Sequence, residues 1–177
     1  MEWQEGLHFS PNERLAQWIT EPPCTCEYVY GGNKKKRITP LRYPAFSFED
    51  CPVISCLKER VEQVVQYNFN ATNVNFYGSE KCVIPEHSDF EKLFHSSRNQ
   101  QFKIASISLG TPRALVVRRK NSDSSNHITL NPLDIMVMEG TFQRDYTHQI
   151  LQTSHKCGPR LNFTFRTIIN HTSTCSS

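Results

Sequence analysis

Two histidines and an aspartate are the residues of this sequence whose types and spacing could bind a metal ion. His87 and Asp89 stand two positions apart in "CVIPEHSD", so an imidazole and a carboxylate share one face at the end of a strand-like segment. His148 follows in "YTHQI". Two histidines and one carboxylate on one face of an octahedron, with the other positions open, are typical of non-haem Fe(II) oxygenases. A His-x-Asp pair also arises by chance, so an ordinary buried polar network stays an alternative.

A row of polar side chains runs along "RLNFTFR" near the C-terminus. Alternation along a strand separates the apolar set Leu161, Phe163 and Phe165 from the polar set Arg160, Asn162, Thr164 and Arg166. Two guanidiniums aimed into the same space require an anion, because a lone buried cation is costly and arginine matches a carboxylate through two parallel hydrogen bonds. That anion is either an acidic side chain or a ligand.

A co-substrate could supply the anion. An Fe(II) site of this kind needs two electrons to split O2, and 2-oxoglutarate provides them while it chelates the iron and its far carboxylate binds an arginine. Asn75 and Tyr77 are also two positions apart, in "NVNFY", so an amide and a phenol could hydrogen-bond the same acid. For each pair the alternative is a buried polar network without a ligand.

Short strands must position these residues. From residue 73 onward, runs of strand-forming residues alternate with turn-rich breaks. The predicted strands are "NVNFY", "CVIPEHSD", "KIASISLG", "ALVVRRK", "HITL", "DIMVMEG", "YTHQI" and "RLNFTFRTII". Seven or eight strands in about a hundred residues favour a sandwich or a jelly roll.

Two helices are predicted before the strands, as covers for the sheet. The first is indicated by the capping signal "SPNE" at residues 10–13 and the apolar residues Leu15, Trp18 and Ile19. The second begins near Asp50 and Pro52. Its apolar residues recur at helical spacing, at Ile54, Leu57, Val61, Val64 and Val65. Residues 21–49 are predicted to form a loop or hairpin that carries several tyrosines and phenylalanines.

Length and composition indicate one domain. A chain of 177 residues suffices for one hydrophobic core and is short for two. No apolar stretch reaches the ~20 residues that cross a bilayer, and the first residues lack the pattern of a signal peptide. Seven cysteines without regular spacing favour a reducing, intracellular compartment, in the nucleus or the cytoplasm. Cys24 and Cys26 could hold a soft metal, but without a second ligand pair at zinc-like spacing we predict free thiols.

The motifs follow one another in a recognisable order. They are Asn75-x-Tyr77, His87-Ser-Asp89-x-Glu91, "IASISLG", "DIMVMEG", Tyr146-x-His148 and Arg160-x-Asn162-x-Thr164-x-Arg166. Across residues 70–168 this order resembles the AlkB family of Fe(II)- and 2-oxoglutarate-dependent dioxygenases, most of all the members that demethylate nucleic-acid bases. The likeness is weaker through "LRYPAFSF" and the helix after it.

The resemblance implies a fold and a division of the chain. The fold is mainly β with flanking helices, a double-stranded β-helix or jelly roll with iron at one mouth. Residues 1–177 would be a single dioxygenase domain. Within it, residues 1–70 would supply helices and a nucleotide-recognition lid, and residues 71–170 the catalytic jelly-roll core.

Roles of individual residues follow from the same resemblance. The implied iron ligands are His87, Asp89 and His148. The implied 2-oxoglutarate contacts are Asn75, Tyr77, Arg160, Asn162 and Arg166, with Arg166 on the distal carboxylate and Arg160 nearer the iron. Glu91 is expected near the exocyclic amine of the damaged base, while Tyr28, Tyr30 and Tyr43 are candidates for stacking on a flipped base or for packing. Close relatives often carry a second acid directly after the iron-binding aspartate, where this sequence has Phe90.

The activity implied is oxidative demethylation of N-alkylated bases, such as N1-methyladenine or N3-methylcytosine, in DNA or RNA. It would use Fe(II), O2 and 2-oxoglutarate and release succinate, CO2 and formaldehyde. We expect a monomer without membrane association that acts on methylated, single-stranded nucleic acid, with Lys34–Arg37 and Arg118–Lys120 on the phosphates or else merely solvated. The alternatives are an oxygenase of the same type acting on a protein, a lipid or a modified tRNA base, and a catalytically idle nucleic-acid-binding jelly roll.

Overall fold

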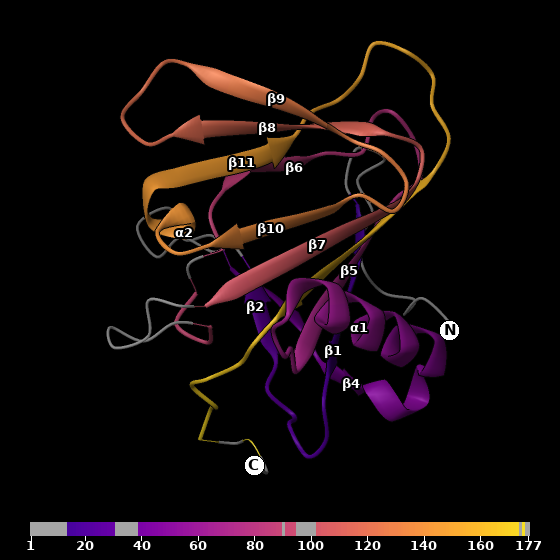
Figure 1. The fold of residues 1–177 in the computed structure, drawn as a ribbon, viewed down its shortest axis with the longest axis vertical. Coiled ribbons are helices and arrows are strands. Elements are labelled where there is room, and N and C mark those ends of the chain that lie inside the picture. The colour runs from indigo at the N-terminus through magenta and orange to yellow at the C-terminus, as the bar shows by residue number, and fades with distance from the viewer. Residues whose placement is uncertain (1–13, 31–38, 90, 95–101, 174, 176–177) are drawn as a thin grey trace.

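Two β-sheets stacked face to face form the body of the molecule, and a helix covers the outer face of the larger one (Figure 1). The computed structural model describes residues 14–30, 39–89, 91–94, 102–173 and 175. The six-stranded sheet has the order β10 (Ile135–Glu139), β7 (Lys103–Gly110), β12 (Arg160–Arg166), β5 (Ala71–Tyr77), β1 (Leu15–Thr20) and β4 (Ala45–Ser47). The four-stranded sheet has the order β6 (Ile84–His87), β11 (Tyr146–Ile150), β8 (Arg113–Arg119) and β9 (Ser125–Leu130). This arrangement confirms the predicted jelly roll.

Smaller elements connect and cover the sheets. The region predicted as a loop or hairpin holds β2 (Tyr28–Tyr30), which pairs with β3 (Leu41–Tyr43), followed by β4 and the 3-10 helix η1 (Phe48–Asp50). The helices are α1 (Pro52–Val65) and the four-residue α2 (Phe142–Asp145). In the part of the chain that the structure describes, no helix is long and apolar enough to span a membrane.

The central strand β12 divides the larger sheet into an apolar and a polar face. Phe163 and Phe165 point into a core that contains Ile54, Val61 and Val65 of α1, so the apolar face lies under this helix. Phe165 has no exposed surface. The alternate residues of β12, from Arg160 to Arg166, point into the space between the two sheets. The predicted separation of the two faces is therefore confirmed.

The second predicted helix is correct, with one exception in its buried stripe. Helix α1 begins with Pro52 in its first turn and ends at Val65, and its C-cap Gln66 adopts a left-handed conformation with φ 53°. Ile54, Val61 and Val65 are buried, as their spacing predicts. Val64 is 70% exposed and lies outside the stripe.

The first predicted helix is wrong, because Leu15–Thr20 is strand β1. It pairs antiparallel with β5, Leu15 opposite Phe76 and Thr20 opposite Ala71, and parallel with β4 on its other edge. Trp18 and Ile19 point to opposite faces of the sheet and both are fully buried. A strand buried on both faces lacks the alternation that identifies a half-buried strand, so its apolar residues coincided with helical spacing. Residues 10–13 lie outside the described residues.

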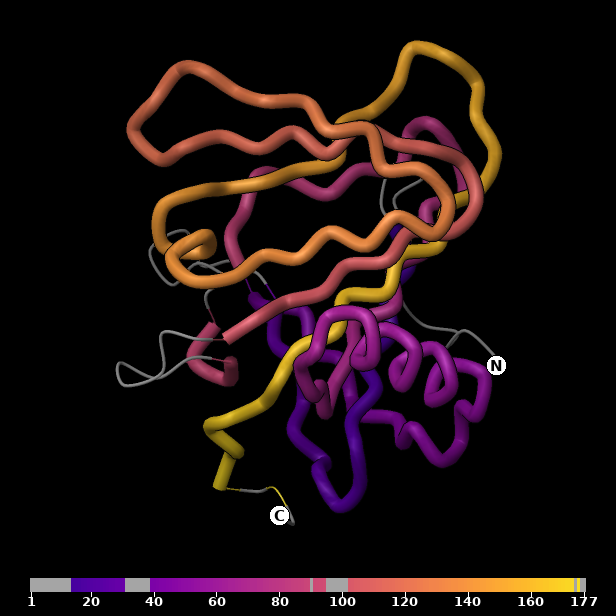
Figure 2. Tube along the Cα trace, in the orientation of Figure 1, coloured from indigo at the N-terminus to yellow at the C-terminus, as the bar shows by residue number. Residues whose placement is uncertain are grey.

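The path of the chain brings distant segments together at one end of the larger sheet. Figure 2 shows the segment after β12, in yellow, running toward the same end of the molecule as the indigo loop between β1 and β2. The backbone N–H of Thr25 in that loop donates to the sulfur of Cys175, 3.4 Å away.

Candidate active site

Strand pairing brings the three candidate metal ligands together. His87 ends β6 and lies directly opposite His148 of β11, so the two imidazoles are cross-strand neighbours with ring centres 4.4 Å apart. Asp89 follows β6 by two residues. One of its oxygens lies 3.7 Å from Nε2 of His87, and the other lies 3.6 Å from Nε2 of His148. These separations exceed hydrogen-bond length and allow the three side chains to share an ion.

Neighbouring groups hold the imidazole of His87 and the backbone of Asp89 in place. The carbonyl oxygen of Pro85 lies 2.8 Å from Nδ1 of His87, so Nδ1 carries the proton and Nε2 is left with a lone pair toward the site. The side-chain oxygen of Gln143 in α2 accepts a hydrogen bond from the backbone N–H of Asp89 at 2.8 Å. Gln143 is 1% exposed, so this contact is shielded from water.

The protonation states suit metal ligands. Burial by itself would raise the pKa of Asp89, but the Arg166 guanidinium and the two histidines hold it at about 2. Burial lowers the pKa of His148 to about 4. At neutral pH the site therefore offers a carboxylate and a neutral imidazole, the forms that coordinate divalent metals.

The structure reverses the expected positions of the two arginines of β12. Nη2 of Arg166 lies 2.6 Å from Oδ1 of Asp89, so Arg166 is the arginine beside the candidate metal ligands. Its Nη1 donates to the side-chain oxygen of Asn73. The expectation that Arg166 lies distal to the iron and Arg160 near it is wrong. Arg160 begins β12 and pairs across the sheet with Tyr77 and Gly110, six residues along the strand from Arg166.

Arg160 is a buried cation with unused hydrogen-bond donors. It is 2% exposed, and its Nη2 donates to the hydroxyl of Ser108 at 2.9 Å. Its Nε and Nη1 have no hydrogen-bond partner, and among the described residues no carboxylate is within ion-pair distance. The ring of Tyr77 lies 4.9 Å from the guanidinium carbon. Burial lowers the pKa of Arg160, which marks a cation that lacks a compensating anion.

Asn162 and Thr164 form a closed network between the two arginines. The Asn162 amide donates to the hydroxyl of Ser106 at 2.8 Å and to the carbonyl oxygen of Ile107 at 3.0 Å. The Thr164 hydroxyl donates to the Asn162 side-chain oxygen at 3.0 Å. Asn75 lies beside Asn162 in the sheet and accepts a hydrogen bond from Nε of Arg14 at 2.7 Å. The polar network is therefore built from three strands, β5, β7 and β12, and from Arg14, the residue before β1.

One pocket connects the metal candidates with Arg160. It encloses about 550 Å³ of empty space, part of which is open to solvent. Its polar lining includes Arg14, Asn73, Asn75, Tyr77, His87, Asp89, Ser106, His148, Arg160, Asn162, Thr164 and Arg166. Its apolar lining includes Ile84, Leu115, Leu130, Met136, Met138 and Ile150.

The candidate substrate residues occupy different positions around the pocket. Tyr28 and Tyr30 line it, and the Tyr30 ring meets the His87 ring edge-on at 6.2 Å. The Tyr28 hydroxyl donates to Oε1 of Glu91 at 2.8 Å, while Oε2 of Glu91 is buried without a partner. Burial raises the pKa of Glu91. Tyr43 is buried behind Tyr28, with ring centres 6.1 Å apart. Neither Tyr43 nor Glu91 is among the lining residues described.

Of the two basic runs, the structure describes Arg118–Lys120. Nε of Arg118 lies 3.6 Å from Glu86, and Nζ of Lys120 donates to the carbonyl oxygen of Gln143 at 3.0 Å. Arg119 is exposed. The run at Lys34–Arg37 and the residue Phe90 lie outside the described residues.

Sequence reasoning missed several residues of the site. Ser106 and Ser108 stand two positions apart in "KIASISLG" and point to the same face of the sheet as the polar side chains of β12. Two serines at every second position of an otherwise apolar strand are a signal that could have been read. Arg14 and Gln143 gave no such signal, because their contacts depend on how the chain returns to the pocket.

Comparison with known proteins identifies relatives over most of the chain. The 2OG-Fe(II) oxygenase superfamily matches residues 6–166. Alpha-ketoglutarate-dependent dioxygenase alkB homolog 3 of Mus musculus is 33% identical over 167 residues, which are 89% of this chain and 52% of the relative. DNA oxidative demethylase ALKBH2 of Arabidopsis thaliana is 24% identical over 173 residues, 84% of this chain and 54% of the relative. The chain thus spans about half the length of these curated relatives.

A solved structure agrees with the architecture. The structure of OsALKBH1 matches with a TM-score of 0.52 and 17% identity, over 90% of this chain and 82% of the other. At this identity the likeness concerns the fold alone.

Proposed function

Because the chain belongs to the AlkB family of the 2OG-Fe(II) oxygenase superfamily, we propose that it is an Fe(II)- and 2-oxoglutarate-dependent dioxygenase that demethylates N-alkylated bases of nucleic acids. The single observation that carries the proposal is the arrangement of one pocket. The triad His87, Asp89 and His148 lines it together with Arg160, a buried guanidinium with two unpaired N–H groups. A co-substrate that chelates a metal with one end and carries a carboxylate at the other fits both features.

Each residue has a proposed task in this reaction. His87, Asp89 and His148 hold Fe(II), and Arg166 keeps Asp89 ionised and in place. Arg160 binds the far carboxylate of 2-oxoglutarate through its unpaired N–H groups, beside Tyr77. Asn75 and Asn162, which line the same pocket, would lie near the bound co-substrate. Iron held there would allow O2 to oxidise both 2-oxoglutarate, which would become succinate and CO2, and the methyl group, which would leave as formaldehyde.

The proposed substrate is a methylated base in single-stranded DNA or RNA. N1-methyladenine and N3-methylcytosine cannot keep their Watson–Crick pairs, so they are cheaper to extrude than normal bases. Both carry a positive charge. Glu91 offers a carboxylate oxygen without a partner, and Tyr28 orients that carboxylate. Tyr30 is the candidate for contact with the base, since it lines the pocket beside His87.

Exposed basic residues would hold the nucleic-acid backbone. Arg119 is the most available cation of its run, because Arg118 and Lys120 already have partners. Such contacts position the strand without reading its sequence. We propose that residues 1–177 act as one dioxygenase domain and as a monomer, and that affinity for the oligonucleotide falls as salt is added.

The test is loss of a methyl group from a defined oligonucleotide. Metal-free protein is reconstituted anaerobically with Fe(II), then given O2, ascorbate, 2-oxoglutarate and a single-stranded oligonucleotide that contains N1-methyladenine. Mass spectrometry should show the loss of one methyl group and the appearance of succinate. A methylated peptide serves as the alternative substrate. If succinate is released while the oligonucleotide stays unchanged, the protein is an oxygenase of this type but the proposed nucleic-acid substrate is wrong.

Glu91→Gln should selectively weaken turnover of cationic bases. The amide keeps an oxygen that accepts from Tyr28 but removes the negative charge, and a hydrogen bond to a charged group contributes ~1.5–3 kcal/mol. We expect kcat/KM for N1-methyladenine to fall about tenfold or more, with a smaller change for the neutral base N3-methylthymine. Glu49→Gln, at an exposed glutamate of η1, is the matched control. Equal losses on both bases would show that Glu91 does not recognise charge.

A further inference from the structure

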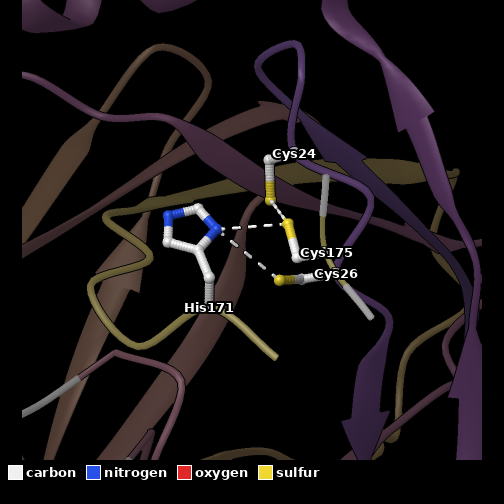
Figure 3. Close-up of side chains that lie close together, drawn as sticks. All are labelled: Cys24, Cys26, His171 and Cys175. Carbon is white, nitrogen blue, oxygen red and sulfur yellow. Dashed lines mark hydrogen bonds between the residues drawn. The ribbon is translucent and has the colours of Figure 1, made fainter. Parts of the chain in front are cut away.

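Three cysteines and a histidine from the two ends of the described chain converge on one point. Cys24 and Cys26 lie in the loop between β1 and β2, while His171 and Cys175 lie in the segment after β12 (Figure 3). The three sulfurs and the imidazole nitrogen all lie within 4.8 Å of one another. The sequence prediction of free thiols rested on the lack of a second ligand pair. The fold supplies that pair as His171-x3-Cys175.

The measured separations match a tetrahedral metal site. With Zn–S near 2.3 Å and Zn–N near 2.0–2.1 Å, the edges of a tetrahedron are about 3.8 Å between sulfurs and about 3.6 Å between sulfur and nitrogen. The sulfurs of Cys24 and Cys175 are 3.7 Å apart. Nδ1 of His171 lies 3.7 Å from the sulfur of Cys26 and 3.3 Å from that of Cys175. The four side chains are thus spaced as ligands of one small ion.

Backbone N–H groups surround the sulfurs in the manner expected for thiolates. The N–H of Thr172 donates to the sulfur of Cys26 at 3.3 Å, and the N–H of Thr25 donates to that of Cys175 at 3.4 Å. Such donors stabilise negative charge on a metal-bound sulfur and fix its direction. They belong to the same two segments as the four ligands, so each segment helps to orient a ligand of the other.

The loop that carries the first two cysteines is anchored to β1. The Thr20 hydroxyl donates to the carbonyl oxygen of Cys24 at 2.6 Å, and Nε1 of Trp18 donates to that of Cys26 at 2.8 Å. Both side chains are almost fully buried. The positions of Cys24 and Cys26 are therefore set by the sheet, which makes half of the site rigid before any ion binds.

We propose that Cys24, Cys26, His171 and Cys175 bind one Zn²⁺ as a structural site, separate from the iron site. Four protein ligands leave no open position, which is the mark of structural rather than catalytic zinc. Thiolates favour zinc, whereas two histidines and a carboxylate suit Fe(II), so the two sites select different metals. Binding displaces three thiol protons and leaves a complex of net charge −1, formed from Zn²⁺, three thiolates and a neutral imidazole.

The zinc site would support the wall of the pocket that receives the substrate. Tyr28 follows Cys26 by two residues and stacks on Trp18, with ring centres 5.2 Å apart. The same tyrosine donates to Glu91. A zinc ion that joins the segment after β12 to this loop would therefore hold Tyr28 in place, although none of the four zinc ligands belongs to the triad.

Cobalt substitution of the unmodified chain is the direct test. Reduced, metal-free protein is titrated with Co²⁺ under nitrogen. A tetrahedral site with three sulfurs gives intense visible d–d bands and thiolate-to-cobalt charge transfer in the near ultraviolet, whereas an octahedral site of histidines and a carboxylate gives only weak bands. We expect the intense spectrum to appear with one equivalent and to be abolished by one equivalent of Zn²⁺. Its absence from fully reduced protein would overturn the proposal.

Variants assign the signal to these ligands. Cys26→Ser and His171→Ala should lose the charge-transfer band and most of the zinc measured by mass spectrometry. The controls are Cys56→Ser, at an exposed cysteine of α1, and His155→Ala, at an exposed histidine. Both control variants should keep the charge-transfer band and the zinc. His148→Ala should keep the zinc as well. Zinc-free native protein with Cys24 disulfide-bonded to Cys175 in a non-reduced peptide map would also overturn the proposal.

Discussion

Replacing Arg160 with methionine should raise the dissociation constant of 2-oxoglutarate by a factor on the order of 100 or more. Truncating one partner of a buried, hydrogen-bonded charge pair costs ~2–5 kcal/mol, and each 1.4 kcal/mol is tenfold in affinity. The measurement is anaerobic calorimetric titration of 2-oxoglutarate into protein loaded with Mn²⁺. Arg160→Lys should recover only part of the affinity, because an ammonium cannot donate two parallel hydrogen bonds to a carboxylate.

The same substitution should leave the ligand-free protein as stable as before, or more stable. Nε and Nη1 of Arg160 have no hydrogen-bond partner in the described structure, so methionine removes a buried cation that has no carboxylate beside it. The free energy of unfolding in urea checks this. The stabilisation that 2-oxoglutarate gives the wild type should disappear in the variant. A large loss of stability without ligand would show instead that Arg160 serves the fold.

Arg119→Met is the control for charge. Arg119 is exposed on β8, so this substitution removes one positive charge without changing a residue of the pocket. Affinity for 2-oxoglutarate should not change. If Arg119→Met and Arg160→Met weaken binding equally, the effect comes from net charge and the proposed carboxylate contact is wrong.

Alternation predicts a face but not a position along the strand. The spacing in "RLNFTFR" correctly placed Arg160, Asn162, Thr164 and Arg166 on one face. Which arginine lies near Asp89 depends on the register of β12 against β5 and on where β6 ends. Neither is encoded in β12 itself, and the two arginines were therefore assigned the wrong way round.

Long-range pairing also explains what else the sequence left open. The strands from residue 73 onward were predicted because turn residues separate them, and the triad because His87 and Asp89 stand two positions apart. Strand β1 was missed because burial on both faces removes its alternation. The cysteine cluster was missed because its two halves are 145 residues apart, from Cys26 to His171. Local sequence patterns thus sufficed to predict most strands and one helix, whereas the contacts between distant elements could be identified only from the folded structure.

Asp89→Ala and His148→Ala should both abolish activity but should differ in their effect on folding. Each removes one of three candidate metal ligands, so we expect kcat/KM on the methylated oligonucleotide to fall below detection, by a factor on the order of 1000 or more, as lost metal ligands remove the chemistry itself. Affinity for the metal should fall in both variants. It is measured by calorimetry with Mn²⁺ in place of Fe(II). Activity alone cannot distinguish them.

Stability distinguishes the two variants because Asp89 has a second partner. Asp89→Ala leaves the guanidinium of Arg166, which is 4% exposed, without its carboxylate. Removing one partner of a buried ion pair costs ~3–5 kcal/mol. His148 is neutral at pH 7 because burial lowers its pKa to about 4, and its Nδ1 has no hydrogen-bond partner in the described structure. Its loss leaves no charge behind, so the metal-free variant should unfold within about 1–2 kcal/mol of the wild type.

The double variant Asp89→Ala/Arg166→Met tests the cause of the difference. Removing both charges should restore much of the stability lost in Asp89→Ala, since apolar replacement of a whole buried ion pair is often neutral. Activity should stay absent, because the metal ligand is still missing. Urea unfolding of metal-free protein at neutral pH measures all four chains. The rings of Tyr28 and Phe94 lie 5.5 and 5.1 Å from the guanidinium carbon of Arg166. If the double variant is no more stable than Asp89→Ala, Asp89 does not stabilise the fold through the ion pair. Arg166 would then stabilise it separately, by packing against these two rings.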